Sequence, residues 1–232
     1  MAPPRRRRWP RRLGVGLVVL LALLTGVDFG ARLLAEEWLS GQIRTATGAE
    51  RVSATIGSFP FLPPLLISGS VAHVDVVADG VPAGQFSFDR VSVRASEVRL
   101  DRKLLFASHV AEPVSIASAV VRADLTSAEL SKALGHRITF GSGGRITVVV
   151  GQRQLPAQAR VVGGHLLVVT VDGLTVATVE LSRSGLLPAC DLALTVSHGM
   201  MTFTCRLAPV PASLLQALAG YRADGPGPVQ PP

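Results

Sequence analysis

The chain has 232 residues, 48% of them hydrophobic, and a formal net charge of +7 at pH 7. Six arginines between Arg5 and Arg12 carry six of these positive charges, so the remainder of the chain is close to neutral. A near-neutral body lacks the basic face that neutralises phosphates, which argues against a nucleic-acid-binding protein. The two cysteines are too few for a disulfide-rich scaffold or for a zinc site made of cysteines.

The first 27 residues are predicted to be a targeting segment and membrane anchor. Residues 1–12 form a basic stretch, and Leu13–Val27 follows with 15 residues and no charge. A helix of this length spans about 22 Å, less than the ~30 Å hydrocarbon core of a bilayer, unless Phe29 and Ala31 extend it. Arginines ahead of the apolar run place the remainder outside the cytoplasm. Without a convincing cleavage site or a lipobox cysteine, we expect an uncleaved single-pass signal anchor; a cleaved peptide and a secreted protein are the alternative.

Residues Asp28–Thr47 have the spacing of an amphipathic helix that ends at Gly48. We expect its apolar side to pack on a sheet and its charged side to face water. The predicted apolar side comprises Val27, Ala31, Leu34 and Trp38, extended by Leu39, Ile43 and Ala46. The predicted solvated side comprises Arg32, Glu36, Glu37 and Arg44.

Gly57–Leu66 is the most apolar segment after the N-terminus, but it contains Pro60, Pro63 and Pro64. Because proline fixes φ and lacks an amide donor, we expect an irregular apolar segment rather than a helix or a central strand. It is either a core plug or the start of a strand, or it is a hydrophobic lip that contacts lipid or a partner.

The remainder is predicted to be rich in antiparallel strands. Alternating apolar residues indicate a strand over Gly84–Leu100, with a phase slip that suggests a bulge at Asp89-Arg90. Two-residue turns at Gly163-Gly164 and Asp172-Gly173 indicate a meander of neighbouring strands. The expected strands are Val114–Leu125, Ile146–Val150, Arg160–Val162, His165–Val171 and Leu174–Leu181.

Two short helices are predicted within this part. Thr126–Glu129 is a capping box, which starts a helix that Gly135 ends. A second helix is expected over Ser213–Ala219. The domain plan is an anchor over 1–27, one α+β domain over 28–220, and a Pro/Gly-rich disordered tail over 221–232.

Cys190 and Cys205 flank a predicted hairpin whose turn lies in Ser197-His198-Gly199. A turn centred between Ser197 and His198 makes the cysteines face each other, and a turn one residue later makes them diagonal. Both a disulfide and two buried thiols fit this pattern. Export favours the disulfide.

No catalytic motif is evident, and we predict a protein that is not an enzyme and holds no metal or cofactor. His73-x-Asp75 places two side chains on one strand face, where they could bind a metal or orient a base, but an exposed polar face is the simpler interpretation. Ser142 lies in a glycine-rich loop rather than in a nucleophile turn.

The order of these segments resembles the bacterial LmeA-like phospholipid-binding family over most of the chain. The Phe-Pro-Phe-Leu sequence at residues 59–62 is the specific part of the likeness. The remaining parts are the anchor Leu13–Val27, the amphipathic helix Asp28–Thr47, the strand within Val52–Leu62, the Leu-Leu-x-x-Gly sequence at Leu65–Gly69 and the β-rich stretch Val71–Pro209.

The resemblance implies an elongated α+β fold, with a long helix packed in a curved, mainly antiparallel sheet, similar to tubular lipid-binding proteins. It also implies a membrane-anchored protein that binds phospholipid in the cell envelope of high-GC bacteria and supports maturation of lipid-linked mannans. We expect acyl chains in an apolar groove and the head group at Arg51 or Arg94. The expected lipid-contacting residues are Trp38, Phe59, Phe61, Leu62, Leu65, Leu66, Phe86 and Phe88.

Two other interpretations stay open. One is a membrane-proximal scaffold whose Phe-Pro-Phe-Leu segment docks an envelope enzyme and which has no lipid ligand. The other is a hydrolase of envelope glycans or lipids, which needs two close carboxylates or a Ser/His pair.

Overall fold

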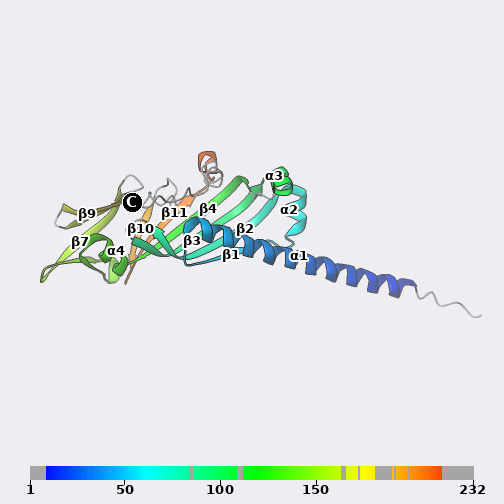
Figure 1. The fold of residues 1–232 in the computed structure, drawn as a ribbon, viewed down its shortest axis with the longest axis horizontal. Coiled ribbons are helices and arrows are strands. Elements are labelled where there is room, and N and C mark those ends of the chain that lie inside the picture. Colours follow the sequence, from blue (N-terminus) through cyan, green and yellow to red (C-terminus); the bar gives the residue numbers. More distant parts are fainter. Residues whose placement is uncertain are drawn as a thin grey trace, which may run out of the picture.

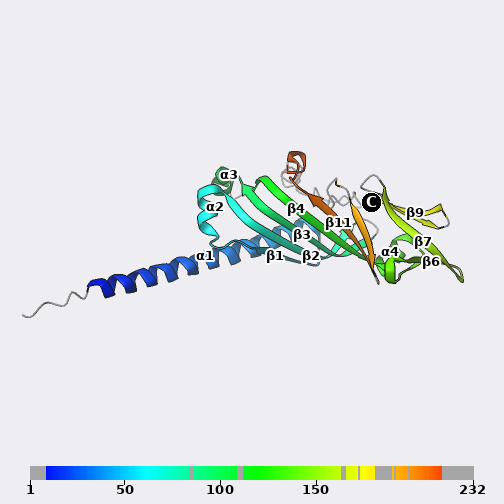
Figure 2. The ribbon, with the colours of Figure 1, turned by 180° about the vertical axis from the view of Figure 1, so that it is seen from behind.

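The first element of the described chain is one long helix, α1 (Trp9–Thr47), which continues without a break across the expected boundary between Val27 and Asp28. The computed structural model describes residues 9–83, 86–108, 112–162, 166–171, 173–180, 190, 192–197 and 199–215. The first half of α1 projects from the body and the second half lies along it (Figures 1 and 2). By length and composition, Gly16–Thr47 contains a stretch able to cross a membrane. The α1 helix ends at Gly48, as predicted, with a φ of +68°.

The larger sheet is antiparallel, with the strand order β1-β2-β3-β4-β11-β10. The connections β1–β2 and β3–β4 carry the short helices α2 (Leu62–Ser68) and α3 (Arg102–Ser108), which lie together at one end of the molecule (Figure 1). Its strands are β1 (Arg51–Ile56), β2 (Ser70–Ala83), β3 (Phe86–Leu100), β4 (Pro113–Thr126), β10 (Ala193–Ser197) and β11 (Met200–Leu207).

A second antiparallel sheet, of order β5-β6-β7-β8-β9, lies at the opposite end (Figure 1). The helix α4 (Ser127–Leu134) precedes it, and the turn η1 (Ser142–Gly144) connects its first two strands. The fold is therefore α+β and antiparallel, as predicted, with the strands divided between two sheets. The strands are β5 (Arg137–Phe140), β6 (Ile146–Val150), β7 (Arg153–Val162), β8 (Leu166–Val171) and β9 (Leu174–Glu180).

The main core lies where the two sheets and α4 meet. Phe88 packs edge-to-face against Phe86 and Phe203, with ring centroids 5.2 and 6.2 Å apart. Leu125 and Leu130 are fully buried in the same cluster. A smaller core cluster forms at the α2 end, around Ile56, Phe61, Val71, Ala95 and Val98. The body thus has one core at each end of its long strands.

Most strand predictions are confirmed, but the predicted bulge at Asp89-Arg90 is wrong. Asp79 pairs with Arg90 and Val81 pairs with Phe88, so β2 and β3 keep one register across that site. Gly80 lies between these pairs with a φ of +65°, a conformation that glycine adopts without strain. The apolar phase of β3 therefore changes without an extra residue, opposite the positive-φ Gly80 of β2.

One of the two hydrogen bonds expected of the capping box is confirmed. Thr126 Oγ1 accepts the Glu129 N–H at 3.4 Å, and Gly135 ends α4 in the left-handed conformation. The Glu129 carboxylate accepts from the backbone N–H and hydroxyl of Ser87, at 3.1 and 3.0 Å, and so ties α4 to β3.

Several predictions lie wholly or partly outside the described residues. They are the basic residues 1–8, the turn residues 163–165 and 172, the strand ends Gly84 and Leu181, residues 216–219 of the C-terminal helix, and the tail 221–232. Residues 212–215 are helical, which confirms the start of the helix predicted over Ser213–Ala219.

Candidate functional site

The body-facing side of α1 covers the edge strand β1 with polar groups. Ser40 Oγ accepts the Ala54 N–H at 2.9 Å, and Glu36 Oε1 accepts the Ile56 N–H at 2.7 Å. Arg32 Nε donates to the same Glu36 oxygen at 2.9 Å. These bonds pair amide groups of an edge strand that otherwise lack partners in the sheet. The expectation that Arg32 and Glu36 face solvent is therefore wrong.

The pKa of Glu36 reflects these contacts. Burial raises the pKa of this carboxyl, but the Ile56 N–H and the bonded, positively charged Arg32 together outweigh burial and hold it below its usual range. The carboxylate is therefore ionised at neutral pH.

Part of the predicted apolar side of α1 faces outward instead of toward the sheet. Val27, Leu34 and Trp38 were expected to face the sheet, but they are 61%, 70% and 44% exposed. Ala31 packs against the smaller core cluster, as predicted, together with Ala35. Leu39 and Ile43, also predicted on this side, are half-buried. The apolar stripe is displaced because the contact is with a strand edge, which requires hydrogen-bond acceptors.

Asp28 joins α1 to α2. It is only 6% exposed, and its carboxylate accepts the Phe61 N–H with both oxygens at 2.9 Å and the Leu62 N–H at 2.6 Å. These are backbone donors at the start of α2, which have no partner within that helix. The contact fixes α2 beside the first charged residue after the apolar run of α1.

The existence of α2 corrects the prediction of an irregular segment. Pro63 and Pro64 occupy its first turn, where proline's missing N–H is not needed. Gly69 ends the helix with a φ of +67°, and Arg102 Nη1 donates to the Ile67 carbonyl at 2.6 Å. The prolines thus start this helix instead of preventing it.

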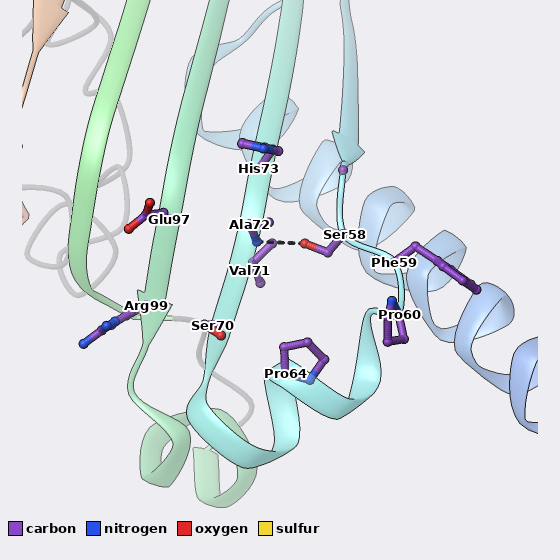
Figure 3. Close-up of a pocket in the computed structure, with 11 residues that line it drawn as sticks. Ser58, Phe59, Pro60, Pro64, Ser70, Val71, Ala72, His73, Glu97 and Arg99 are labelled. Atoms are coloured by element: carbon purple, nitrogen blue, oxygen red, sulfur yellow. Dashed lines mark hydrogen bonds between the residues drawn. The ribbon is translucent and has the colours of Figure 1, made fainter.

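A cavity of about 470 Å³ lies beside α2, between residues 57–64 and the ends of β2 and β3 (Figure 3). One wall is apolar and includes Phe59, Pro60 and Pro64. The other wall lies on the strands, where Ser58 Oγ accepts the Ala72 N–H at 2.8 Å. The polar lining residues are Ser58, Ser70, His73, Glu97 and Arg99. Such a lining suits an amphiphilic ligand.

The predicted lipid-contacting residues fall into three places. Phe59 lines the cavity and Leu66 is exposed on α2, whereas Phe61 is buried behind them with Leu62 and Leu65 partly buried around it. Trp38 lies further along α1 and is 44% exposed. Phe86 and Phe88 belong to the main core. From Phe88 to Val98, β3 covers about 33 Å, so these two aromatics are far from Phe59.

The two predicted head-group arginines do not line the cavity. Arg94 is bonded to Asp75 across β2 and β3, and the bond and charge of this aspartate raise the pKa of the guanidinium. Arg51 lies at the far end of β1, paired with Asp79 in the ladder. Arg99 lines the cavity instead. Choosing Arg99 from the sequence would have required the β2–β3 register, which places Arg99 opposite Ser70.

His73 and Asp75 share the exposed face of β2, in line with the simpler of the two sequence interpretations. His73 Nδ1 lies 3.3 Å from Ser96 Oγ, and Asp75 is held by Arg94. Among the described residues, no group of three His, Cys, Asp or Glu side chains is placed to hold a metal ion.

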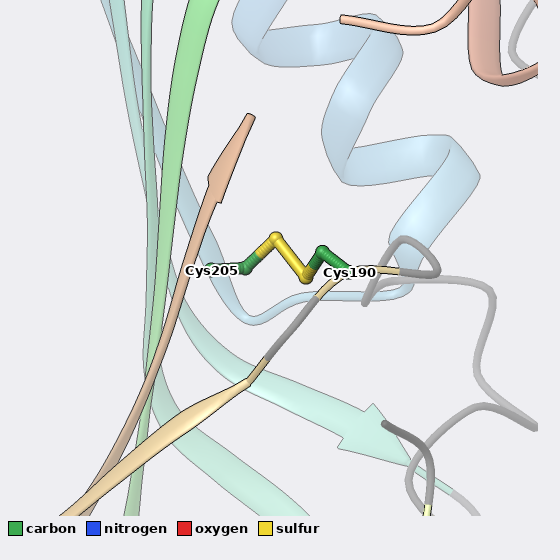
Figure 4. Close-up of a disulfide and its surroundings, with 2 residues drawn as sticks. All are labelled: Cys190 and Cys205. Carbon is green, nitrogen blue, oxygen red and sulfur yellow. A yellow bond between two sulfur atoms is a disulfide. The ribbon is translucent and has the colours of Figure 1, made fainter. Parts of the chain in front are cut away.

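Cys190 and Cys205 form a disulfide with a Cα–Cα distance of 6.0 Å (Figure 4). The pairs Ala193–Thr204 and Ser197–Met200 place the hairpin turn one residue later than the facing arrangement requires. The cysteines are therefore in the diagonal arrangement. Their bond joins β11 to the residues before β10.

Comparison with known proteins gives one finding. No curated protein and no solved structure matches the chain. A family model described as LmeA-like phospholipid-binding matches residues 26–217, which include the second half of α1, the α2 end and both sheets. The chain therefore belongs to the LmeA-like phospholipid-binding family.

Proposed function

We propose that this protein is a membrane-anchored, extracytoplasmic phospholipid-binding protein of the cell envelope that holds its lipid non-covalently and is not an enzyme. A role in the maturation of lipid-linked mannans, which the family suggests, is part of the proposal. The observation that carries it is the cavity with one apolar and one polar wall, next to the point where α1 leaves the body.

The two walls of the cavity suit the two parts of a phospholipid. The acyl chains leave along Phe59, Pro60 and Pro64, and each buried CH₂ contributes about 0.8 kcal/mol. The head group and glycerol lie against the strand wall, where Arg99 supplies a positive charge for the phosphate. Arg99 has no ion pair within the described part of the chain, so its charge is available to an anion.

Phospholipid photolabelling tests this arrangement. The full chain is placed in phosphatidylglycerol and phosphatidylethanolamine vesicles that contain a phospholipid with a diazirine near the head group. We expect adducts on residues of the strand wall, such as His73 and Glu97. Adducts confined to residues 16–27 of α1 would show only surrounding bilayer lipid and would contradict the proposal.

Two substitutions of an alanine by tryptophan, one inside the cavity and one outside it, provide the control. Ala72→Trp fills the cavity, because Ala72 lines it and its side chain is exposed. Ala117→Trp places the same ring at an exposed position of β4 outside the cavity. We expect cavity labelling to fall about tenfold in the first variant, equivalent to ~1.4 kcal/mol of lost binding, and to be unchanged in the second.

The scaffold interpretation is tested by the same preparations. A chain that shows no cavity adducts in vesicles but retains one envelope protein through Phe59 would favour the scaffold. Phe59→Asp, at a 74% exposed position, then releases that protein.

A further inference from the structure

Three large apolar side chains gather at the α2 end of the body and are exposed. Phe59, Leu66 and Ile67 are 74%, 50% and 75% exposed, and together we call them the apolar tip. Outside α1 and the tip, the exposed large hydrophobic residues of the described chain are Val114, Val150, Val162 and Leu174. The last three belong to the second sheet, at the other end of the molecule. Exposed apolar residues that cluster, unlike scattered ones, indicate a contact surface.

The packing of the fold does not account for the tip. The helix α2 is apolar from Leu62 to Ile67, yet it contains no buried residue. Phe61, just before it, already fills the adjacent core cluster and is 5% exposed. Leu66 and Ile67 therefore point away from the protein.

Asp28 fixes the level of the tip relative to α1. Its carboxylate binds the first donors of α2, and it directly follows the uncharged run Leu13–Val27. With that run in the hydrocarbon core, α2 lies no farther from the bilayer centre than the boundary between the acyl chains and the head groups. Figures 1 and 2 show α2 lying across the end of the body where α1 emerges, not parallel to α1.

The exposed side of α1 supports the same position of the apolar tip relative to the bilayer. Phe29, Leu33 and Leu34 continue the exposed apolar surface beyond Asp28, at 56%, 48% and 70% exposed. From Leu13 to Leu34, a helix covers about 33 Å, which matches a ~30 Å hydrocarbon core better than the 22 Å of the uncharged run alone. On this side the apolar surface of α1 continues past Asp28, so the acyl chains can reach the level of the tip.

We propose that the apolar tip is a second membrane contact, in which Phe59, Leu66 and Ile67 insert among the lipids of the leaflet from which α1 emerges. This inference rests on the proposed membrane anchoring. It goes beyond that proposal because it assigns a lipid-surface contact to the folded body. The cavity, which Phe59 also lines, then opens directly at that leaflet.

Site-specific photocrosslinking of the full chain tests the contact. Ile67 and Phe59 are replaced, one at a time, by photoreactive benzoylphenylalanine in vesicles of phosphatidylglycerol and phosphatidylethanolamine. Leu174, 74% exposed in the second sheet, is the matched control, and Leu23, 63% exposed in α1, reports on anchoring. We expect roughly tenfold more lipid adduct at positions 67 and 59 than at 174, since insertion of one such side chain favours the lipid by that order.

Each outcome decides between the two proposals. Adducts at 23, 59 and 67 with few at 174 support the contact, even if the cavity stays unlabelled and lipid binding in the cavity fails. Adducts at 23 alone overturn the contact and leave the anchor in place. Equal labelling at 67 and 174 overturns the contact as well, and an unlabelled position 23 overturns anchoring and contact together.

Discussion

At the scale of single residues, Asp28 is a buried carboxylate that holds α2 against α1. A carboxylate that is 6% exposed is stable only when its oxygens are bonded, and here the partners are the Phe61 and Leu62 N–H groups. Removing the side chain leaves buried backbone donors without an acceptor. The α2 helix then loses its attachment to α1.

We predict that Asp28→Ala lowers the free energy of unfolding by about 2–3 kcal/mol, the cost of unpaired groups in a buried charged contact. Asp28→Asn keeps one acceptor oxygen and should cost less. Asp101 is the matched control, because its carboxylate also caps two backbone donors, at Lys103 and Leu104, but in a more exposed setting. For Asp101→Ala we expect about 1 kcal/mol.

Guanidinium unfolding of the full chain in mild detergent measures these differences. Hydrogen exchange then localises the effect, and the amides of α2 should exchange faster in Asp28→Ala than in Asp101→Ala. If both variants unfold at the same denaturant concentration, Asp28 has no special role.

Glu36 predicts a pH dependence of stability. Because contacts in the folded state hold its pKa below the usual value, the ionised carboxylate stabilises the fold above the pKa of an unfolded glutamate. This contribution is lost as the pH falls through the folded-state pKa. From about pH 5 to about pH 3, the wild-type chain should therefore lose more stability than Glu36→Gln.

Glu37 provides the comparison, since it is the exposed neighbour of Glu36 on α1. Glu37→Gln is the same substitution at that exposed position and serves as the matched control. A Glu36→Gln variant with an unchanged slope would show that the Ile56 and Arg32 contacts do not influence the titration.

The same residues show why the packed side of α1 was only partly predictable. The spacing of hydrophobic residues predicts that Arg32 and Glu36 face solvent, because charged side chains usually lie on the solvated side of an amphipathic helix. The acceptors are needed because β1 is a sheet edge with amides pointing at α1. Which strand lies at an edge is a property of the folded sheet and does not appear in local spacing.

At the scale of elements, the sequence predicted best those helices and strands whose caps, alternation and turn residues lie within the element itself. The capped helix α4, the strand β6 and the β7–β9 meander follow from caps, alternation and turn glycines in their own segments. The α2 helix did not follow, since three prolines argue against a helix unless they lie in its first turn. Here the missing information was Asp28, which is 33 residues from the amide that it binds.

The disulfide is the element-scale feature with the clearest test. It closes a loop with a sequence separation of 15, for which chain-entropy arguments give about 3 kcal/mol of stabilisation. We predict that a reducing agent lowers the unfolding midpoint of the wild-type chain. The variant Cys190→Ala should start at the lower value and should not respond to the reductant, which is measured by parallel denaturant titrations.

Cys205 is a poor choice for this experiment, because it is fully buried in the main core. Replacing it would remove packing as well as the bond. A wild-type midpoint that is the same with and without reductant, despite confirmed reduction of the bond, would contradict a stabilising role.

At the scale of the whole molecule, the order of segments was predictable and their distribution over two ends was not. The sequence supports an apolar helix followed by an antiparallel body, and the family match covers residues 26–217. Phe59 and Phe88 were both expected to contact the lipid. Long strands separate them, since β3 has 15 residues and the two aromatics belong near opposite ends.

The continuity of α1 also determines how far the protein reaches. Between Asp28 and Thr47 the helix rises about 30 Å along the edge of the larger sheet, and the smaller sheet lies beyond its end. A stiff rod of this kind works as a spacer of fixed height. In the anchored state proposed above, with the residues before Asp28 embedded, β5–β9 would stand away from the lipid surface and the cavity would stay beside the leaflet.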